Sequence, residues 1–148
     1  MEINKSIIIP CKDEKENINN VLHGIFKSLK DDTEIIIVVD DESDSTIKNL
    51  PNNIENLRTL INKYGPGPAE AIRYGIDNST GNSVCIFMGD GSDDPDQIEE
   101  LFSLIERGVS VAVATRYSRG GQYVGNSTLK YLLSRVSGLI LYYLFFIK

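Results

Sequence analysis

The sequence is poor in the residues that build disulfide, zinc and histidine-dependent sites. It has two cysteines, one histidine and no tryptophan in 148 residues. Cys11 and Cys85 cannot form a disulfide framework, and no Cys-x-x-Cys or Cys/His set indicates a zinc site. His23, the single histidine, falls on the polar side of its predicted helix. Catalytic triads that depend on a histidine base are therefore excluded in practice.

Basic residues are also in the minority. Lys and Arg number 15 against 21 Asp and Glu, which gives a formal net charge of −6. This balance argues against nucleic-acid binding, which needs clustered Lys and Arg to neutralise phosphates. The N-terminal residues lack a basic segment followed by a long apolar stretch, so no signal peptide is evident. We therefore expect one globular unit in a reducing, cytoplasmic setting.

One apolar run stands out, at the C-terminus. Residues 136–147 read VSGLILYYLFFI and carry no charge. As a helix these residues would rise only ~18 Å, less than the ~30 Å hydrocarbon core of a bilayer. Three interpretations stay open: a helix packed on the core, a helix docked on a membrane surface, and, least favoured, a complete span. We expect a domain at 1–128, followed by this incomplete apolar helix at 129–148.

Short apolar runs alternate with amphipathic segments along the chain. The apolar runs predict buried strands at residues 6–10, 34–39, 57–61, 83–88 and 110–114. Apolar residues at helical spacing predict helices over 18–30, 45–50, 69–76 and from Pro95 to about residue 105. This alternation favours right-handed βαβ crossovers. The expected fold class is α/β, a Rossmann-like, mainly parallel sheet with helices on both faces.

Polar residues follow four of the predicted strands. They lie at 12–14, 40–41, 90–94 and at Arg116. Ligands of open parallel sheets bind beyond the carboxyl ends of the strands, so these residues should share one rim. The arginine side chain could face a diphosphate there with two parallel hydrogen bonds. This rim is the candidate active site.

The acidic residues of the rim have two interpretations. Asp90, Asp93 and Asp94 lie so close in the chain that a cation should offset their repulsion. Oxygen ligands suit Mg²⁺ or Mn²⁺, which complete their shells with water and substrate phosphates. Alternatively, Asp93 or Asp94 caps the helix that Pro95 begins. We expect both roles, with Asp90 the ligand and Asp94 mainly structural.

The run DDESD at 40–44 follows a buried strand. Carboxylates at such a position commonly accept hydrogen bonds from ribose hydroxyls or a base edge. The alternative is that Asp44 or Ser43 caps the next helix and that the other residues form a solvated loop. The glycines of the turn at 65–68 allow a ligand or another element to approach the backbone closely.

Five segments in one order resemble a known family: SIIIPCKDEKENI, VVDDESDST, YGPGPAEAIRYGI, IFMGDGSDDPDQIEEL and VAVATRY. They are similar to the family 2 inverting glycosyltransferases of the GT-A fold, and most of all to dolichol-phosphate and polyprenyl-phosphate mannosyl- and glucosyltransferases. The similarity covers nearly the whole chain. It implies a UDP- or GDP-sugar donor, a divalent metal on its diphosphate, and a polyprenyl or dolichyl phosphate or another glycan acceptor.

The resemblance also implies roles for individual residues. The residues implied for the nucleotide pocket are Pro10, Lys12, Glu14, Val39, Asp41, Gly89 and Asp90, with Asp40 as a second candidate beside Asp41. Asp90 matches the second acid of the family's Asp-x-Asp metal motif, whose first acid falls on Met88. Ser92 and Asp93 are candidates to assist as ligands. Arg116 matches the arginine that faces a phosphate, so Asp90 and Arg116 are the expected catalytic residues.

Family catalytic domains extend beyond this C-terminus, so we expect a C-terminally shortened member. The predicted function is transfer of a sugar by metal-assisted inverting displacement, with a membrane surface as a candidate partner at its cytoplasmic face. A lipid phosphate is ionised already and needs no general base. The main alternative is a catalytically inactive remnant that binds the donor. A receiver domain is disfavoured because the acidic pair follows the second strand, and a nucleotidyltransferase because no glycine-rich basic loop follows the first.

Overall fold

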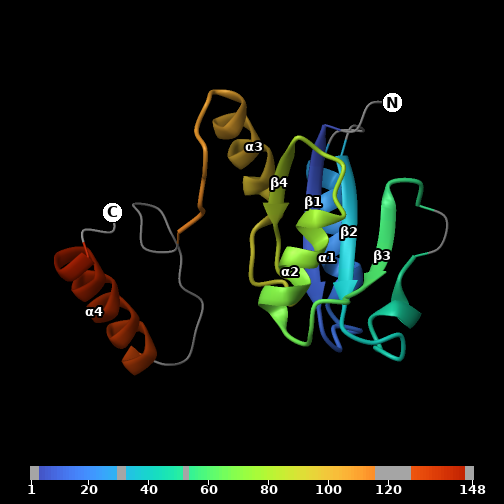
Figure 1. Cartoon of the computed structure of the whole chain (residues 1–148), viewed down its shortest axis with the longest axis horizontal. Coiled ribbons are helices and arrows are strands. Elements are labelled where there is room, and N and C mark those ends of the chain that lie inside the picture. The colour runs from blue at the N-terminus through green and yellow to red at the C-terminus, as the bar shows by residue number, and fades with distance from the viewer. Residues whose placement is uncertain (1–3, 30–32, 52–53, 116–127, 146–148) are drawn as a thin grey trace. The chain divides into compact units, whose positions relative to one another are not determined.

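The computed structural model describes residues 4–29, 33–51, 54–115 and 128–145 (Figure 1). The chain divides into two compact units, residues 1–114 and 115–148. The first unit contains the sheet and the candidate site. The second contains one long helix. Each unit is described by itself.

A four-stranded parallel sheet forms the first unit, with the strand order β3-β2-β1-β4. The strands are β1 (Lys5–Cys11), β2 (Thr33–Val39), β3 (Leu57–Ile61) and β4 (Ser83–Ile86). The central strand β1 pairs with β2 on one side and with β4 on the other. Every residue of β1 and β2 is buried, which is the pattern of parallel strands covered on both faces.

Helices cover both faces of this sheet, as the sequence predicts (Figure 1). Successive residues of a strand point to opposite faces, so β1 contributes to two cores. On one face its side chains pack with α1 (Ile18–Ser28) and α3 (Ile98–Glu106). On the other face they pack with α2 (Pro68–Asp77). Gly75 of α2 has no room for a Cβ, which would run into Ile8, so this glycine permits close helix–sheet packing.

Three predicted elements differ from the structure. Residues 110–114 are extended but form no strand ladder, and Val111 and Val113 are each 76% exposed. Their β propensity is local, whereas a strand needs a hydrogen-bonded neighbour, and β4 is the last strand of the described sheet. β4 itself ends at Ile86, two residues earlier than predicted. The predicted helix at 45–50 is a single 3₁₀ turn, η1 (Ile47–Asn49).

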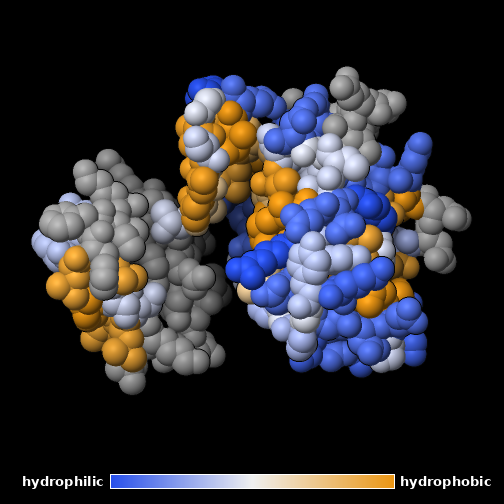
Figure 2. Space-filling model, in the orientation of Figure 1, coloured by the Kyte–Doolittle hydropathy of each residue, from blue (hydrophilic) through white to orange (hydrophobic). Residues whose placement is uncertain are grey.

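The second unit is described over α4 (Thr128–Phe145). Apolar side chains lie on all sides of this helix rather than along one stripe, including Leu132, Val136 and Ile140, and they are exposed. Figure 2 shows hydrophobic surface along it. Among the helices of the described residues, none is both long enough and apolar enough to cross a bilayer.

Candidate functional site

The carboxyl ends of β1, β2 and β4 meet at one edge of the sheet because these strands are parallel neighbours. The loops that follow them begin at residues 12, 40 and 87. A cavity of about 170 Å³ lies at this edge. Its lining consists of Pro10, Cys11, Lys12, Glu14, Asp40, Gly67, Pro68, Ala71 and Met88. Two polar segments of the predicted rim, at 12–14 and 40–41, therefore reach a common hollow, and the loop after β4 reaches it through Met88.

The loop after β1 is held by the loop after β2. Asp13 has a positive φ of 58°, a conformation that costs a non-glycine residue energy. Its backbone N–H donates to both carboxylate oxygens of Asp44, at 3.1 and 3.2 Å. The next N–H, of Glu14, donates to the hydroxyl of Thr46 at 2.9 Å. These contacts fix the direction in which Lys12 and Glu14 leave the sheet.

The two adjacent acids at the end of β2 have different surroundings. Asp40 is half-buried and accepts hydrogen bonds from the Asn62 amide at 2.8 Å and from the Gly67 N–H at 2.9 Å. Asp41 is exposed and accepts the N–H of Ser43 at 2.6 Å. Hydrogen bonding from Ser43 lowers the pKa of the Asp41 carboxyl, so this group is ionised at neutral pH. The Asp41 carboxylate is thus open to solvent, whereas the Asp40 carboxylate is hydrogen-bonded to Asn62 and Gly67.

Asp44 is the buried end of the same acidic run. Burial by itself would raise the pKa of its carboxyl, yet the hydrogen bonds from Thr46 and Asp13 outweigh burial and lower it. The sequence left open a capping role for Asp44. In the structure it accepts the Thr46 N–H at 2.8 Å, just before η1, and also reaches across to the neighbouring loop.

The loop after β4 packs tightly on β1. Gly89 is buried, and a Cβ placed on it would lie 2.6 Å from the Cys11 sulfur. Asp90 is exposed and accepts the Ser92 N–H at 2.9 Å through Oδ1. Asp93 accepts the Met88 N–H at 2.8 Å. This glycine therefore lets the acidic loop approach the end of the central strand.

Asp94 has the structural role that the sequence predicts. Its carboxylate caps the 3₁₀ turn η2 (Pro95–Gln97), which precedes α3, by accepting the Asp96 N–H at 3.1 Å. A carboxylate at this position satisfies a backbone donor that the turn leaves without an intrahelical partner.

The described residues contain no group of three or more His, Cys, Asp or Glu side chains that could enclose a metal ion. The exposed carboxylate of Asp90 is an oxygen donor with one of its two oxygens engaged by Ser92. Mg²⁺ and Mn²⁺ accept such a site, because they retain water and bind substrate phosphates alongside one or two carboxylates. The residues present therefore fit a divalent ion that is shared with a phosphate ligand.

The structure brings three of the seven predicted pocket residues to the cavity, namely Pro10, Lys12 and Glu14. Asp41 and Gly89 are chain neighbours of the lining residues Asp40 and Met88, and Asp90 is one residue further along. Val39 is buried in the core, where its carbonyl accepts the Asn62 N–H at 2.8 Å. Arg116 lies outside the described residues. The sequence did not predict the wall made by Pro68 and Ala71, for which the glycine-rich turn at 65–68 was the available signal.

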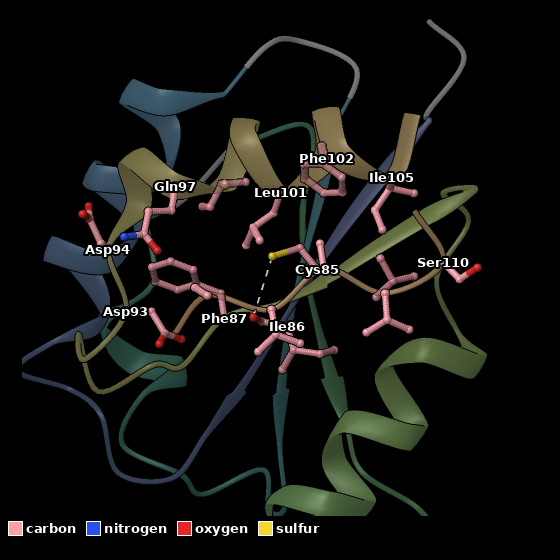
Figure 3. Close-up of a pocket in the computed structure, with 16 residues that line it drawn as sticks. Cys85, Ile86, Phe87, Asp93, Asp94, Gln97, Leu101, Phe102, Ile105 and Ser110 are labelled. Atoms are coloured by element: carbon pink, nitrogen blue, oxygen red, sulfur yellow. Dashed lines mark hydrogen bonds between the residues drawn. The ribbon is translucent and has the colours of Figure 1, made fainter. Parts of the chain in front are cut away.

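A larger cavity, of about 460 Å³, lies between β4, α3 and the extended segment 110–114 (Figure 3). Its lining is mostly apolar, with Asp93 and Asp94 at one end. Burial, reinforced by the charge of Asp93, raises the pKa of the Cys85 thiol to about 11. Because this thiol is protonated at neutral pH, the cavity offers a packing surface rather than a reactive group.

The fold is a parallel α/β sheet with a cavity at the carboxyl ends of its strands, and the comparisons with known proteins show its family. The model of the family described as "Glycosyl transferase family 2" matches residues 6–141. The chain belongs to this family, and its structural neighbours have the GT-A fold.

Two curated relatives and one solved structure illustrate the likeness. The chain is 34% identical over 128 residues to an uncharacterized glycosyltransferase of Synechocystis, covering 82% of the chain and 40% of that protein. It is 25% identical over 120 residues to the dolichol-phosphate mannosyltransferase of Pyrococcus furiosus, covering 79% of the chain and 34% of that protein. The chain thus spans two fifths or less of either relative.

The solved structure is glucosyl-3-phosphoglycerate synthase of Mycobacterium tuberculosis, in complex with Mn²⁺, UDP and glucosyl-3-phosphoglycerate. It aligns with a TM-score of 0.56 at 18% identity, over 69% of this chain and 39% of the other. This likeness establishes the fold.

Proposed function

We propose that residues 1–128 bind a nucleotide-diphosphate sugar, UDP- or GDP-linked, in the rim cavity and donate its sugar to an acceptor. The observation that carries this proposal is the cavity itself, which opens where β1, β2 and β4 end and is lined by Lys12, Glu14 and Asp40. This is where parallel α/β sheets bind nucleotides. Membership of glycosyl transferase family 2 supports the same chemistry.

Each rim residue has a role in the proposed reaction. Asp41 accepts hydrogen bonds from the base or ribose, since its carboxylate is ionised and exposed. Asp90 holds a divalent ion on the diphosphate, with Ser92 and Asp93 beside it. When bound, such an ion neutralises charge on the departing nucleoside diphosphate. Arg116, which lies outside the described residues, is proposed to supply positive charge that favours departure of that group.

The transfer is an in-line displacement that inverts the anomeric carbon. We propose a polyprenyl or dolichyl phosphate as the acceptor, because its phosphate oxygen is already ionised near neutral pH and needs no general base. The name of the Pyrococcus furiosus relative supports this acceptor class. The exposed apolar side chains of α4 suit contact with a membrane surface, and we place the enzyme peripherally at its cytoplasmic face.

Donor binding can be tested by thermal shift with UDP, GDP and their sugars, each with and without Mn²⁺. A ligand that binds the folded chain raises its melting temperature by an amount that grows with the logarithm of its concentration relative to the Kd. We expect one nucleotide to stabilise the chain and Mn²⁺ to increase that effect. Asp90→Asn should remove the Mn²⁺ increment, whereas Glu100→Gln, on the exposed surface of α3, should not. No response to any nucleotide would contradict the proposal.

The alternative function is binding of the donor without transfer of its sugar. Incubation with labelled donor sugar and vesicles that contain polyprenyl phosphate separates the two functions. An active enzyme transfers label to the lipid, and Arg116→Ala abolishes the transfer while leaving a folded chain. A remnant shows nucleotide-dependent stabilisation and no labelled lipid.

A further inference from the structure

The acidic run 40–44 at the end of β2 divides according to the partners of its side chains. Asp40 accepts hydrogen bonds from the turn between β3 and α2. Asp44 accepts hydrogen bonds from the loop after β1, on the other side of the strand. Asp41 lies between them in the chain, is exposed, and binds within its own turn. Three of the four acids of this short run therefore contact three different places.

Asp40 organises the turn that makes one wall of the cavity. One carboxylate oxygen accepts the Asn62 amide at 2.8 Å, and the other accepts the Gly67 N–H at 2.9 Å. The same Asn62 side chain accepts the Tyr64 N–H at 3.0 Å and donates to the carbonyl of Gly65. Gly65 and Gly67 have φ of 134° and 117°, conformations that favour glycine, the residue that loses the most conformational entropy on folding. The carboxylate supplies the bonds that hold them.

Asp44 has the corresponding role at the opposite wall. The Asp44 side chain is buried, with 9% of the residue exposed, and accepts a hydrogen bond from the N–H of Asp13. This hydrogen bond stabilises the positive φ of Asp13, which is an unfavourable conformation for a residue other than glycine. The hydroxyl of Ser45 donates to the Asp13 side chain at 3.1 Å. Lys12 and Glu14, on either side of this residue, line the cavity. The position of both side chains thus depends on a carboxylate that follows another strand.

We propose that Asp40 and Asp44 are positioning residues of the donor site. Each fixes one wall of the cavity, and Asp41 keeps its carboxylate for the ligand. This inference rests on the proposed function, because it takes the cavity to be the nucleotide pocket. It assigns Asp40, each of whose oxygens accepts a hydrogen bond from the protein, to the wall of the cavity rather than to contact with the base or ribose.

A charge-conserving exchange of side chains tests the role of Asp40. Asp40→Asn leaves one donor of the turn without an acceptor, and Asn62→Asp places two carboxylates against each other. We expect either single variant to weaken binding of UDP or GDP, whichever the wild type binds, about tenfold. The double variant Asp40→Asn/Asn62→Asp restores the hydrogen bond between the two side chains with donor and acceptor reversed, although residue 62 no longer donates to the Gly65 carbonyl. It should therefore bind the nucleotide more tightly than either single variant, without regaining the full wild-type affinity.

Hydrogen–deuterium exchange separates positioning from direct ligand contact. Asp40→Asn should speed exchange over residues 62–71, and Asp44→Asn should speed it over residues 12–18, in the chain without nucleotide. Asp41→Asn should weaken nucleotide binding and leave both segments protected. Glu34→Gln is the matched control, because it disturbs a buried carboxylate at the opposite edge of the sheet. It should lower stability and leave the Kd of the folded protein unchanged.

The outcomes distinguish this inference from the proposed function. A wild type that binds no nucleotide overturns the proposed function, and this inference with it. A wild type that binds, with Asp40→Asn and Asp44→Asn binding equally well, overturns this inference alone. The same holds when the exchanged pair binds no better than either single variant, or when Glu34→Gln loses as much affinity as Asp40→Asn.

Discussion

Glu34 accepts a hydrogen bond from the hydroxyl of Ser6 at 2.7 Å, and these two residues are direct partners in the β1–β2 ladder. The same carboxylate accepts the backbone and side-chain donors of Thr80 and an ion pair with Arg58 at 3.1 Å. It therefore joins the amino ends of three strands to the turn before β4. This network lies at the edge of the sheet opposite the candidate site.

The Glu34 network makes the free energy of unfolding depend on pH in the acidic range. Burial favours the neutral carboxyl, yet the hydrogen bonds from Ser6 and Thr80 and the charge of Arg58 outweigh burial and lower the pKa below 4.5. A lowered pKa in the folded state means that the stabilisation is present above the unfolded value and is lost as pH falls through the folded value. Urea unfolding at decreasing pH should therefore show a falling free energy of unfolding below about pH 4.5.

Glu34→Gln should remove most of that contribution and cost about 1–3 kcal/mol at neutral pH, because a buried acceptor and an ion pair are lost. The exposed Glu16→Gln should change neither the stability nor its pH dependence measurably. An unchanged acid dependence in Glu34→Gln would show that other carboxylates dominate it.

Gly89→Ala should destabilise the first unit by about 1–3 kcal/mol, because the added methyl meets the Cys11 sulfur at 2.6 Å. Removing that sulfur should relieve the strain. The double variant Gly89→Ala/Cys11→Ala should therefore lose less stability than the two single variants together. Chemical denaturation of all four proteins measures this coupling, and additive losses would contradict the contact as the cause.

Both cysteines should react slowly with iodoacetamide in the folded chain. Burial, with the charges of Glu14 and Asp44, raises the pKa of Cys11 to about 12, and that of Cys85 rises to about 11. At about pH 8, on the order of one Cys11 thiol in ten thousand is then the reactive thiolate. Mass spectrometry should show fast labelling in denaturant alone. Rapid labelling of Cys11 under native conditions would show that the cavity it lines opens to solvent.

Substitutions at Asp90 and at Asp94 should distinguish a metal-ligand role from a helix-capping role. Asp94→Ala removes the cap on η2 and should cost about 1 kcal/mol of stability. Its nucleotide response should keep the Mn²⁺ increment. Asp90→Asn should keep nearly wild-type stability, but Mn²⁺ should no longer add to the rise in melting temperature that the nucleotide causes. Thermal shifts of both variants with nucleotide, with and without Mn²⁺, provide the test, and identical behaviour of the two would refute the division.

Much of the fold could be read from the sequence because the signals are local. The run at 57–61 predicts a strand with the bounds that β3 has, and apolar spacing predicts α1 to within about two residues. The segment 110–114 shows the limit of such reasoning. Its residues favour an extended chain, but whether a neighbouring strand pairs with them depends on residues far away.

The residues at the rim follow from order along the chain, since parallel strands deliver their carboxyl ends to one edge. The chain therefore determined by itself that the loops after β1, β2 and β4, which carry Lys12, Asp41 and Asp90, lie at one edge of the sheet. The hydrogen-bond partners of these acids could not be predicted in the same way. Asp40 and Asp41 are chemically identical neighbours, and only tertiary packing directs one to Asn62 and Gly67 and leaves the other in solvent, because a hydrogen bond requires two groups from distant segments to meet in space.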